Sequence, residues 1–262
     1  MLYDTHCHLN YNTNEELVDI ITRAKQSDLK YIMQAGARIA DIEREVEICK
    51  KFSDEQIKIF CGIANHPEET RDNVISANEI INIAEKNKDI KAIGETGLDT
   101  HIEENMDFVD DQIKSFENHI EASLKLNLPL IIHARGELAI QKCVEMLKFY
   151  QKDGVSAVMH SYTGDVENAK KALDAGCFIS FSGIATFKNA NEVREVVSFV
   201  PIDRMFIETD APFLAPTPMR GKKNETGFVS YTAQFLSNFS QIDYNEFCNT
   251  TTQNAKKFFN HA

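Results

Sequence analysis

Eight short apolar runs, separated by longer amphipathic segments, recur along the chain and constrain its fold more than any other feature of the sequence. The runs are rich in Val, Ile and Phe, which is typical of strands that are buried on both faces of a parallel sheet. Between them, as over 17–24 and 193–200, apolar residues recur at the helical spacing i, i+3, i+4, i+7. The runs span 2–6, 31–35, 57–63, 90–95, 129–133, 155–160, 177–182 and 205–210. This pattern predicts an α/β fold in which strands and helices alternate.

Six side chains that can bind a metal ion stand at or just beyond the ends of five of these runs. They are His6, His8, Glu95, His133, His160 and Asp210. Taken singly, each has a plainer explanation. His6 and His8 could be a solvated pair, His133 and His160 could be core histidines, and Asp210 could be a helix cap. Glu95 could be a surface acid where the fourth run gives way to a glycine-containing loop. Together they predict one metal site, because a parallel barrel gathers the carboxyl ends of its strands at one mouth.

The same residues distinguish between two architectures. In an open doubly wound sheet the first and last strands lie apart, whereas His6, His8 and Asp210 can reach one ion only if those strands are neighbours. We therefore predict a closed (β/α)8 barrel of the TIM type, for which ~250 residues are typical, as a single domain over 1–262 with extra C-terminal helices. The longer helices are expected over 106–126, 137–150, 229–238 and 244–259.

Strand alternation sets the expected direction of the side chains in the first run. Residues i and i+2 of a strand point to the same face, roughly 6.6 Å apart, so the imidazoles of His6 and His8 converge on one ion. Asp4 shares their parity and is expected one layer deeper, where its carboxylate accepts the far N–H of a ligating histidine. Cys7 is expected to point away from the metal and to pack in the core.

Charge, cysteine usage and hydropathy restrict the partners and the location. The formal net charge of -12 and the pI near 5.2 argue against a broad basic face that grips a long duplex, so a nucleic acid would be held locally, as an end or a single strand. The six cysteines are scattered without CxxC pairs, which favours reduced thiols and a cytoplasmic protein. No apolar run approaches ~18 residues, and the first run starts too early to follow a signal peptide, so no membrane association is expected.

Seven segments around the run ends carry a family resemblance. They are DTHCHL at 4–9, GETGLD at 94–99, LPLIIHAR at 128–135, HSYTG at 160–164, SFSG at 180–183, ETDAPFLAP at 208–216 and RGKKNE at 220–225. In this order and number they closely resemble the TatD family of metal-dependent deoxyribonucleases, within the amidohydrolase-like barrels, over nearly the whole chain. The resemblance implies a (β/α)8 barrel, a divalent metal, and hydrolysis of phosphodiester bonds in DNA from 3′ to 5′.

The resemblance and the chemistry of the ligands together suggest how the site is divided between two divalent metal ions. The histidines of the first run and Asp210 would hold one ion. His133 and His160 would hold the second, and Glu95 would bridge the two together with a hydroxide. Asp210 is the candidate that orients or deprotonates the attacking water, so Asp210 and Glu95 are the catalytic candidates. Mixed nitrogen and oxygen ligands favour Zn, Mn, Co or Ni over Mg, and the sequence leaves open whether one ion or two bind.

Basic and aromatic side chains near the mouth are candidates for contacts with the substrate. The basic candidates are Arg135, His66, Arg220 and Lys222. A guanidinium two residues past a ligand can grip a phosphate, and the last two candidates belong to a basic loop beyond the eighth run. Tyr162 and Phe187 can stack on a base. Each has an ordinary alternative, as a solvated charge or as aromatic packing at the rim.

Three functions are compatible with these residues. The first, which we predict, is a monomeric nuclease that acts on DNA ends or single strands through a metal-bound hydroxide. The second is a hydrolase of carboxylic esters or amides, such as an aminoacyl ester on tRNA or a small metabolite, and the acidic composition supports it. The third is a binding protein with structural metal, which we expect to unfold when the metal is lost, whereas an enzyme with a large core should stay folded.

Overall fold

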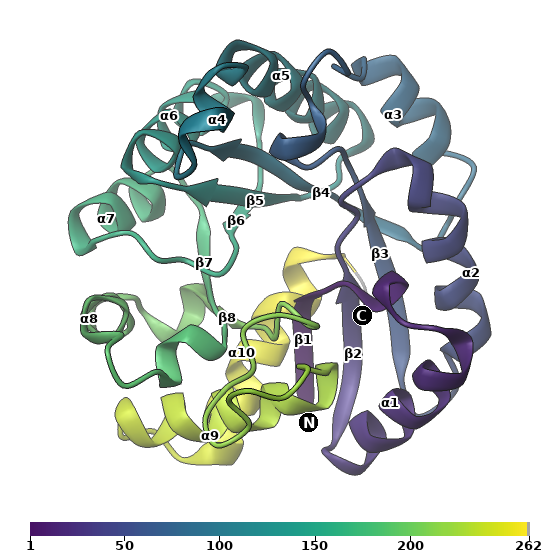
Figure 1. The fold of residues 1–262 in the computed structure, drawn as a ribbon. Helices are drawn as coiled ribbons and strands as arrows, with labels where there is room; N and C mark the ends of the chain where they lie inside the picture. Colours follow the sequence, from purple (N-terminus) through teal and green to yellow (C-terminus); the bar gives the residue numbers. More distant parts are fainter. Residues whose placement is uncertain (261–262) are drawn as a thin grey trace.

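Eight parallel strands, each paired with the next in chain order, close into a barrel in the computed structural model, which describes residues 1–260 (Figure 1). They are β1 (Leu2–Cys7), β2 (Leu29–Gln34), β3 (Lys58–Ile63), β4 (Ile90–Asp99), β5 (Leu130–Arg135), β6 (Ala157–Met159), β7 (Phe178–Phe181) and β8 (Met205–Ile207). Cys7 forms a parallel bridge with Ala211 and so joins β1 to the segment after β8. The Asp210 N–H donates to the carbonyl of His6 at 2.9 Å and completes the ring. The predicted (β/α)8 barrel is confirmed, and the open sheet is wrong for this chain.

Helices surround the ring of strands, as Figure 1 shows. They are α1 (Asn14–Gln26), α2 (Ile42–Phe52), α3 (Ala77–Ala84), α4 (Glu103–Met106), α5 (Val109–Leu126), α6 (Glu137–Phe149), α7 (Val166–Asp174), α8 (Asn191–Phe199), α9 (Val229–Phe239) and α10 (Tyr244–Phe258). The single helix predicted over 106–126 is wrong at its start, because α4 ends at Met106 and a new helix begins at Val109. The two C-terminal helices are confirmed. None of the helices within residues 1–260 is long and apolar enough to span a membrane.

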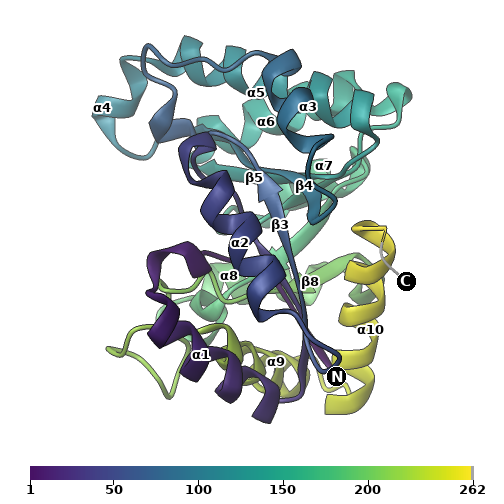
Figure 2. The ribbon, with the colours of Figure 1, turned by 90° about the vertical axis from the view of Figure 1, so that its right-hand side faces the viewer.

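The amino-terminal end of the barrel is filled with apolar side chains and covered by α10. One buried cluster combines residues of six strands with two residues of that helix and the residue that follows it; its members are Tyr3, Met33, Ala92, Ile131, Val158, Phe206, Ala255, Phe258 and Phe259. The Phe206 ring meets the Phe258 ring at 5.2 Å between centroids, nearly edge to face. Helix α10 lies beside the start of the chain (Figure 2), where the Thr252 hydroxyl donates to the carbonyl of Met1 at 3.2 Å. This end of the barrel is therefore closed.

The fourth strand is longer than its apolar run indicates. We expected a glycine-containing loop after Glu95, but β4 continues to Asp99 and pairs with β5 over its whole second half. Gly97 allows this, because a Cβ there would lie 2.1 Å from the carbonyl oxygen of His133, closer than any real side chain can come. The expected loop is wrong, and the extension places Glu95 inside the barrel rather than at its edge.

The first strand is irregular, and this changes the role expected for Asp4. The register with β2 shifts between Asp4 and Cys7, which breaks the alternation on which the expectation rested. The Asp4 carboxylate accepts from the Thr209 N–H at 2.8 Å and from the hydroxyls of Thr209 and Thr226 at 2.6 and 2.5 Å. The predicted bond from a ligating histidine to Asp4 is therefore wrong, and Asp4 instead anchors the segment after β8. Cys7 is buried in the core, as predicted.

Candidate metal centre

The six predicted ligand side chains meet at the carboxyl end of the barrel. The loops after the strands surround a cavity of ≈ 530 Å³ there, and five of the six side chains line it. The sixth, His6, is fully buried at its floor, against Glu95. Side chains far apart in the sequence are thus gathered in one place, as the strand-end pattern predicts.

Glu95 lies at the centre of this cluster, and each of its two carboxylate oxygens faces a different pair of histidines. Its Oε2 lies 3.2 Å from the Nε2 of His6 and 3.4 Å from the Nε2 of His8. Its Oε1 lies 2.8 Å from the Nδ1 of His133 and 2.7 Å from the Nε2 of His160. We call these the Oε2 group and the Oε1 group.

Asp210 belongs to the Oε2 group. Its Oδ1 lies 3.6 Å from the Nε2 of His6 and 3.5 Å from the Nε2 of His8, and those two nitrogens are 3.2 Å apart. The side chain of Asp210 is 15% exposed and that of Glu95 is 5% exposed, so Asp210 is the more accessible of these two carboxylates, both of which line the cavity. Two nitrogen donors and one oxygen donor thus converge beside Glu95, on the side of the barrel formed by β1 and β8.

Two carboxylates behind the Oε1 group orient its histidines. The His133 Nε2–H donates to Asp99 at 3.0 Å, and the His160 Nδ1–H donates to Glu208 at 3.1 Å. The opposite nitrogen of each ring faces Glu95 and can give its lone pair to a cation that replaces the proton there, which is how histidines that bind metals are commonly held. Sequence reasoning missed both acids. The sequence could have indicated both, because each is a carboxylate close to a predicted ligand at the end of an apolar run. Asp99 stands four positions after Glu95, and Glu208 stands two positions before Asp210.

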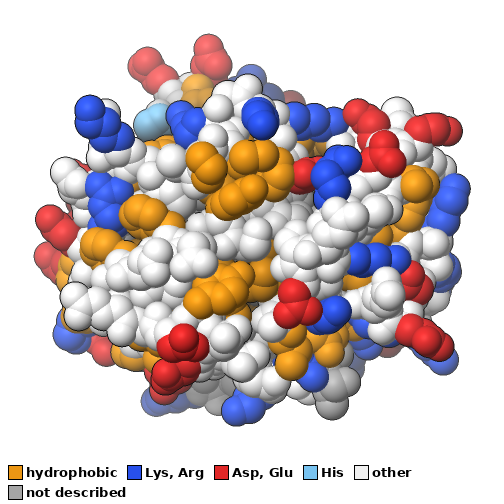
Figure 3. Space-filling view, turned by 90° about the horizontal axis from the view of Figure 1, so that it is seen from below, with side chains coloured by type: hydrophobic (Ala, Val, Ile, Leu, Met, Phe, Trp, Pro, Cys, Tyr) orange, Lys and Arg blue, Asp and Glu red, His pale blue; other side chains and the backbone are white. Residues whose placement is uncertain are grey.

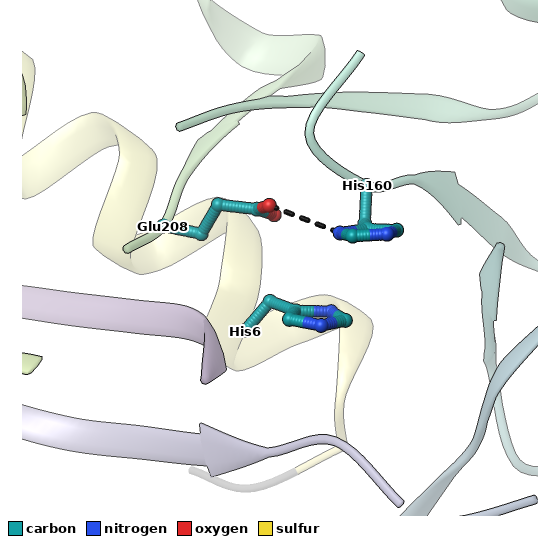
Figure 4. Close-up of side chains that lie close together, drawn as sticks. All are labelled: His6, His160 and Glu208. Atoms are coloured by element: carbon teal, nitrogen blue, oxygen red, sulfur yellow. Dashed lines mark hydrogen bonds and ion pairs between the residues drawn. The ribbon is translucent and has the colours of Figure 1, made fainter. Parts of the chain in front are cut away.

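A third group of donor atoms, from His6, His160 and Glu208, also lies within 4.8 Å of one another. The rings of His6 and His160 are stacked, with centroids 3.9 Å apart and planes 10° apart, and Figure 4 shows Glu208 directed at His160. The lone pairs of an imidazole lie in the plane of its ring, so two parallel rings cannot aim them at one ion. Glu208 is therefore a hydrogen-bond acceptor for His160 and not part of an ion site.

His66 lies nearer to the centre than its predicted role as a substrate contact suggests. Its Nε2 is 3.6 Å from the Oε1 of Glu95, and its ring contacts the ring of His133 at 4.4 Å. The segment that carries it is held by His119, a buried residue that sequence reasoning missed, whose Nε2 accepts from the Asn65 N–H at 3.1 Å. His66 is thus placed either to complete the Oε1 group or to touch a substrate beside it.

Only one of the other three basic residues predicted to contact the substrate lines the cavity. Arg135 lines the cavity, whereas Arg220 and Lys222 lie outside the set of described residues that line it. The guanidinium of Arg220 instead lies 3.7 Å above the centre of the Phe187 ring, which it covers. Tyr162 is buried, and its hydroxyl donates to the carbonyl of Asp165. Neither predicted aromatic is free to stack on a base.

Burial and the neighbouring charges act on the pKa values of the cluster in opposite directions. Burial raises the pKa of Glu95, but the charges of His160 and other histidines outweigh it and hold that pKa well below its usual value. Burial raises the pKa of Asp210 too, but its hydrogen bond to His8 and the charges of the neighbouring histidines together outweigh burial and lower that pKa. Burial lowers the pKa of His8, but its bonds to Asp210 and Glu95 raise that pKa to about 10, and acidic partners likewise raise the pKa of His133 and His160. Protons and cations therefore compete for the same nitrogens.

The donor set fits divalent cations. It combines imidazole nitrogens with carboxylate oxygens, a mixture that suits Zn, Mn, Co or Ni, and Glu95 offers one oxygen to each group. With a parallel barrel below it and an open cavity above it, this arrangement defines the class of barrel hydrolases that depend on metal ions.

Comparison with known proteins identifies the family within that class. The family model described as TatD related DNase matches residues 3–260. Over 99% of each chain, the sequence is 36% identical to the uncharacterized metal-dependent hydrolase YabD of Bacillus subtilis. It is 30% identical to the uncharacterized metal-dependent hydrolase YcfH of Escherichia coli, over 98% of this chain and 95% of that one. The chain belongs to the TatD-related DNase family and is a metal-dependent hydrolase.

Solved structures confirm the fold. The TatD homologue YjjV of Escherichia coli superposes with a TM-score of 0.89 over 100% of this chain and 98% of its own, at 21% identity. The phosphotriesterase homology protein of Escherichia coli, solved with phosphate in its active site, superposes with a TM-score of 0.71 at 15% identity, over 98% of both chains. At these identities the likeness concerns the fold alone.

Proposed function

We propose that the centre hydrolyses phosphodiester bonds of DNA, as an exonuclease that removes nucleotides from 3′ to 5′ with the help of two divalent cations. One observation carries the proposal: Glu95 presents its two oxygens to two separate sets of nitrogen donors. Two adjoining cation sites bridged by a carboxylate suit a displacement at phosphorus, where charge develops on both the entering and the leaving oxygen. A single structural ion would not need a second set of ligands.

The residues of the chain have distinct roles in this proposal. A pair of divalent cations, when bound, supplies Lewis acidity, which acidifies water and stabilises negative charge at phosphorus. Asp210 accepts the proton of the attacking water, because its carboxylate is ionised and reaches the cavity. Asp99 and Glu208 fix the tautomers of His133 and His160. Arg135, at the cavity wall, positions a phosphate.

Charge supports a local grip on the nucleic acid. The net charge is -12, and on the face drawn in Figure 3 the Lys and Arg side chains are interspersed with Asp and Glu. Such a surface does not attract a long duplex. A chain end or a single strand can still enter the cavity, where cations and Arg135 offset its charge. The family description, TatD related DNase, also supports a phosphorus-containing substrate.

One observation favours a second candidate, the hydrolysis of a carboxylic ester or amide. Glu68 and Glu69 line the same cavity, and the guanidinium of Arg38 lies 3.7 Å from the carboxylate of Glu69. The acids offset part of the positive charge at the mouth, which suits a substrate with fewer phosphates, such as an aminoacyl ester or a small metabolite.

An activity panel on metal-reconstituted protein separates these candidates. The substrates are single-stranded DNA labelled at either end, duplexes with recessed or protruding ends, and an aminoacyl ester. We expect the wild type to shorten single strands and protruding ends from the 3′ terminus, and Asp210→Ala to be inactive. The matched control is His101→Ala, which removes an exposed histidine outside the cavity. Turnover of the ester without cleavage of any DNA would overturn the proposal in favour of the second candidate.

A further inference from the structure

Two aromatic rings stand half exposed at the mouth of the cavity, and neither has a role in the centre described above. Tyr11 is 53% exposed and Phe213 is 52% exposed, and both line the cavity. Their ring centroids lie 5.9 Å apart, with planes at 74°. Each ring also packs nearly edge to face on the ring of His8, at 5.7 Å for Tyr11 and 6.3 Å for Phe213. The pair therefore forms an aromatic surface next to one of the candidate ligands.

Hydrogen bonds tie the backbone of both aromatic residues to the backbone that carries His8 and Asp210 of the Oε2 group. Tyr11 ends the 3-10 turn Leu9–Tyr11 that follows β1, and its N–H donates to the carbonyl of His8 at 3.4 Å. The Phe213 N–H donates to the carbonyl of Asp210 at 2.9 Å. The side-chain amide of Asn224, which is buried, donates to the carbonyl of Phe213 at 2.5 Å. The backbone of the aromatic pair is thus held next to that of His8 and Asp210, and both rings contact the His8 ring.

Apolar side chains line one side of the cavity and charged side chains line another. Beside the aromatic pair, Ile184 and Leu214 extend an apolar wall on the side of β7 and β8. The guanidinium group of Arg135 lies at the end of β5, across the barrel from β1 and β8, whereas Arg38 is paired with the carboxylates of Asp41 and Glu69. A ligand that suits this cavity has a flat apolar part on one side of its reacting group and a negative charge on the other.

We propose that Tyr11 and Phe213 form a base-stacking site, the aromatic platform, which receives the nucleobase beside the phosphodiester that is cut. The inference rests on the nuclease function proposed above and specifies how the substrate is held. Aromatic side chains stack on any base, because every base has a π face. The base lies on the platform, the scissile phosphate lies at the metal centre, and the next phosphate faces Arg135.

The platform determines which form of DNA can be cut. A base within a duplex is covered on both faces by its neighbours and is paired along its edge, so it cannot reach the two rings. A base in a single strand or at a frayed end has an open face. The platform therefore selects unpaired bases without selecting a sequence, in agreement with an acidic protein that cannot grip a duplex.

Fluorescence of 2-aminopurine tests the platform separately from catalysis, because stacking quenches it. The probes are two phosphorothioate trinucleotides, with 2-aminopurine at the 3′-terminal or at the penultimate position, added to zinc-loaded protein. The variants are Tyr11→Leu and Phe213→Leu, which keep an apolar side chain but remove the ring. Tyr231→Leu is the matched control, since Tyr231 is a 37% exposed aromatic on α9 that does not line the cavity.

We expect the wild type and Tyr231→Leu to quench one of the two probes, and each platform variant to bind that probe about tenfold more weakly. Equal quenching by all four proteins, or no quenching by the wild type, would overturn the platform. Cleavage of a natural trinucleotide adds a second readout: the variants raise KM about tenfold, and the increase disappears when the stacked nucleotide is abasic. A KM increase that persists on the abasic substrate would also overturn the platform. If the wild type quenches a probe but cuts no oligonucleotide, the nuclease function fails while the platform stands.

Discussion

The two ends of the barrel are built from the same strands and differ in almost every other respect. At the amino-terminal end, Tyr3, Ile131 and Phe206 pack against one another and against α10, without a charged group among the members of that cluster. At the carboxyl end, the same three strands carry or lead into His6, His133 and Asp210. The closed end supplies apolar burial, while the open end contains buried charges whose pKa values are shifted. Stability and chemistry should therefore respond to substitutions at opposite ends.

The largest expected effect is the loss of activity on changing the open end. His133→Ala and Asp210→Ala each remove a donor atom beside Glu95, and we expect both to abolish phosphodiester cleavage. Thermal unfolding should remain cooperative for both, because neither residue belongs to the apolar core. Activity of Asp210→Ala equal to that of the wild type would show that another residue activates the water.

The converse change at the closed end should remove stability and leave the chemistry intact. Phe206 is fully buried and stacks on Phe178 at 4.8 Å, so Phe206→Ala should lower the free energy of unfolding by about 3 to 5 kcal/mol. Urea unfolding measures this loss, and cleavage per folded molecule should match the wild type. Phe149→Ala is the control, since Phe149 is 77% exposed. A variant that is stable but inactive would contradict the separation of the two ends.

A smaller effect is expected from the acceptors behind the Oε1 group. Asp99→Asn and Glu208→Gln keep the shape of each side chain but remove the charge that orients His133 and His160. Metal affinity should fall by about 10- to 100-fold in each variant, with little change in the fold. Titration with a competing chelator measures the affinity. If both variants bind metal as the wild type does, the histidines are oriented by other contacts.

The smallest effect is a graded dependence of metal binding on pH. Acidic partners raise the pKa of His8 to about 10 and also raise the pKa values of His133 and His160, so protons bind these imidazoles more tightly than a free imidazole, and His8 carries one near pH 7. A cation must displace those protons, so its affinity should fall as the pH is lowered, by about tenfold per pH unit for each proton released. Calorimetry in buffers of different ionisation enthalpy counts the protons. An affinity that stays constant between pH 6 and 9 would contradict the proposed competition.

The sequence predicted the barrel and its six polar strand-end residues because both depend on periodicity and residue type. It could not predict features that depend on register. The irregularity in β1 turned Asp4 toward Thr209, and the glycines of β4 extended that strand to Asp99. Both changes follow from how neighbouring strands pair, and the sequence of one strand does not contain that information.

The candidate substrate contacts were the residues hardest to predict from the sequence. Tyr162 and Phe187 follow strands as Tyr11 and Phe213 do, but one is buried and the other is covered by Arg220. Whether an aromatic ring is open to a ligand depends on contacts between loops after different strands. Such contacts have no local signature in the chain.

If Glu95 bridges two cation sites, anomalous scattering from crystals grown with zinc or manganese will locate both. We expect two anomalous peaks ~3.5 to 4 Å apart, one beside His6 and His8 and the other beside His133 and His160. Strong data with a peak at only one oxygen of Glu95, or at neither, from crystals whose metal content has been measured, would show that Glu95 does not bridge two cations.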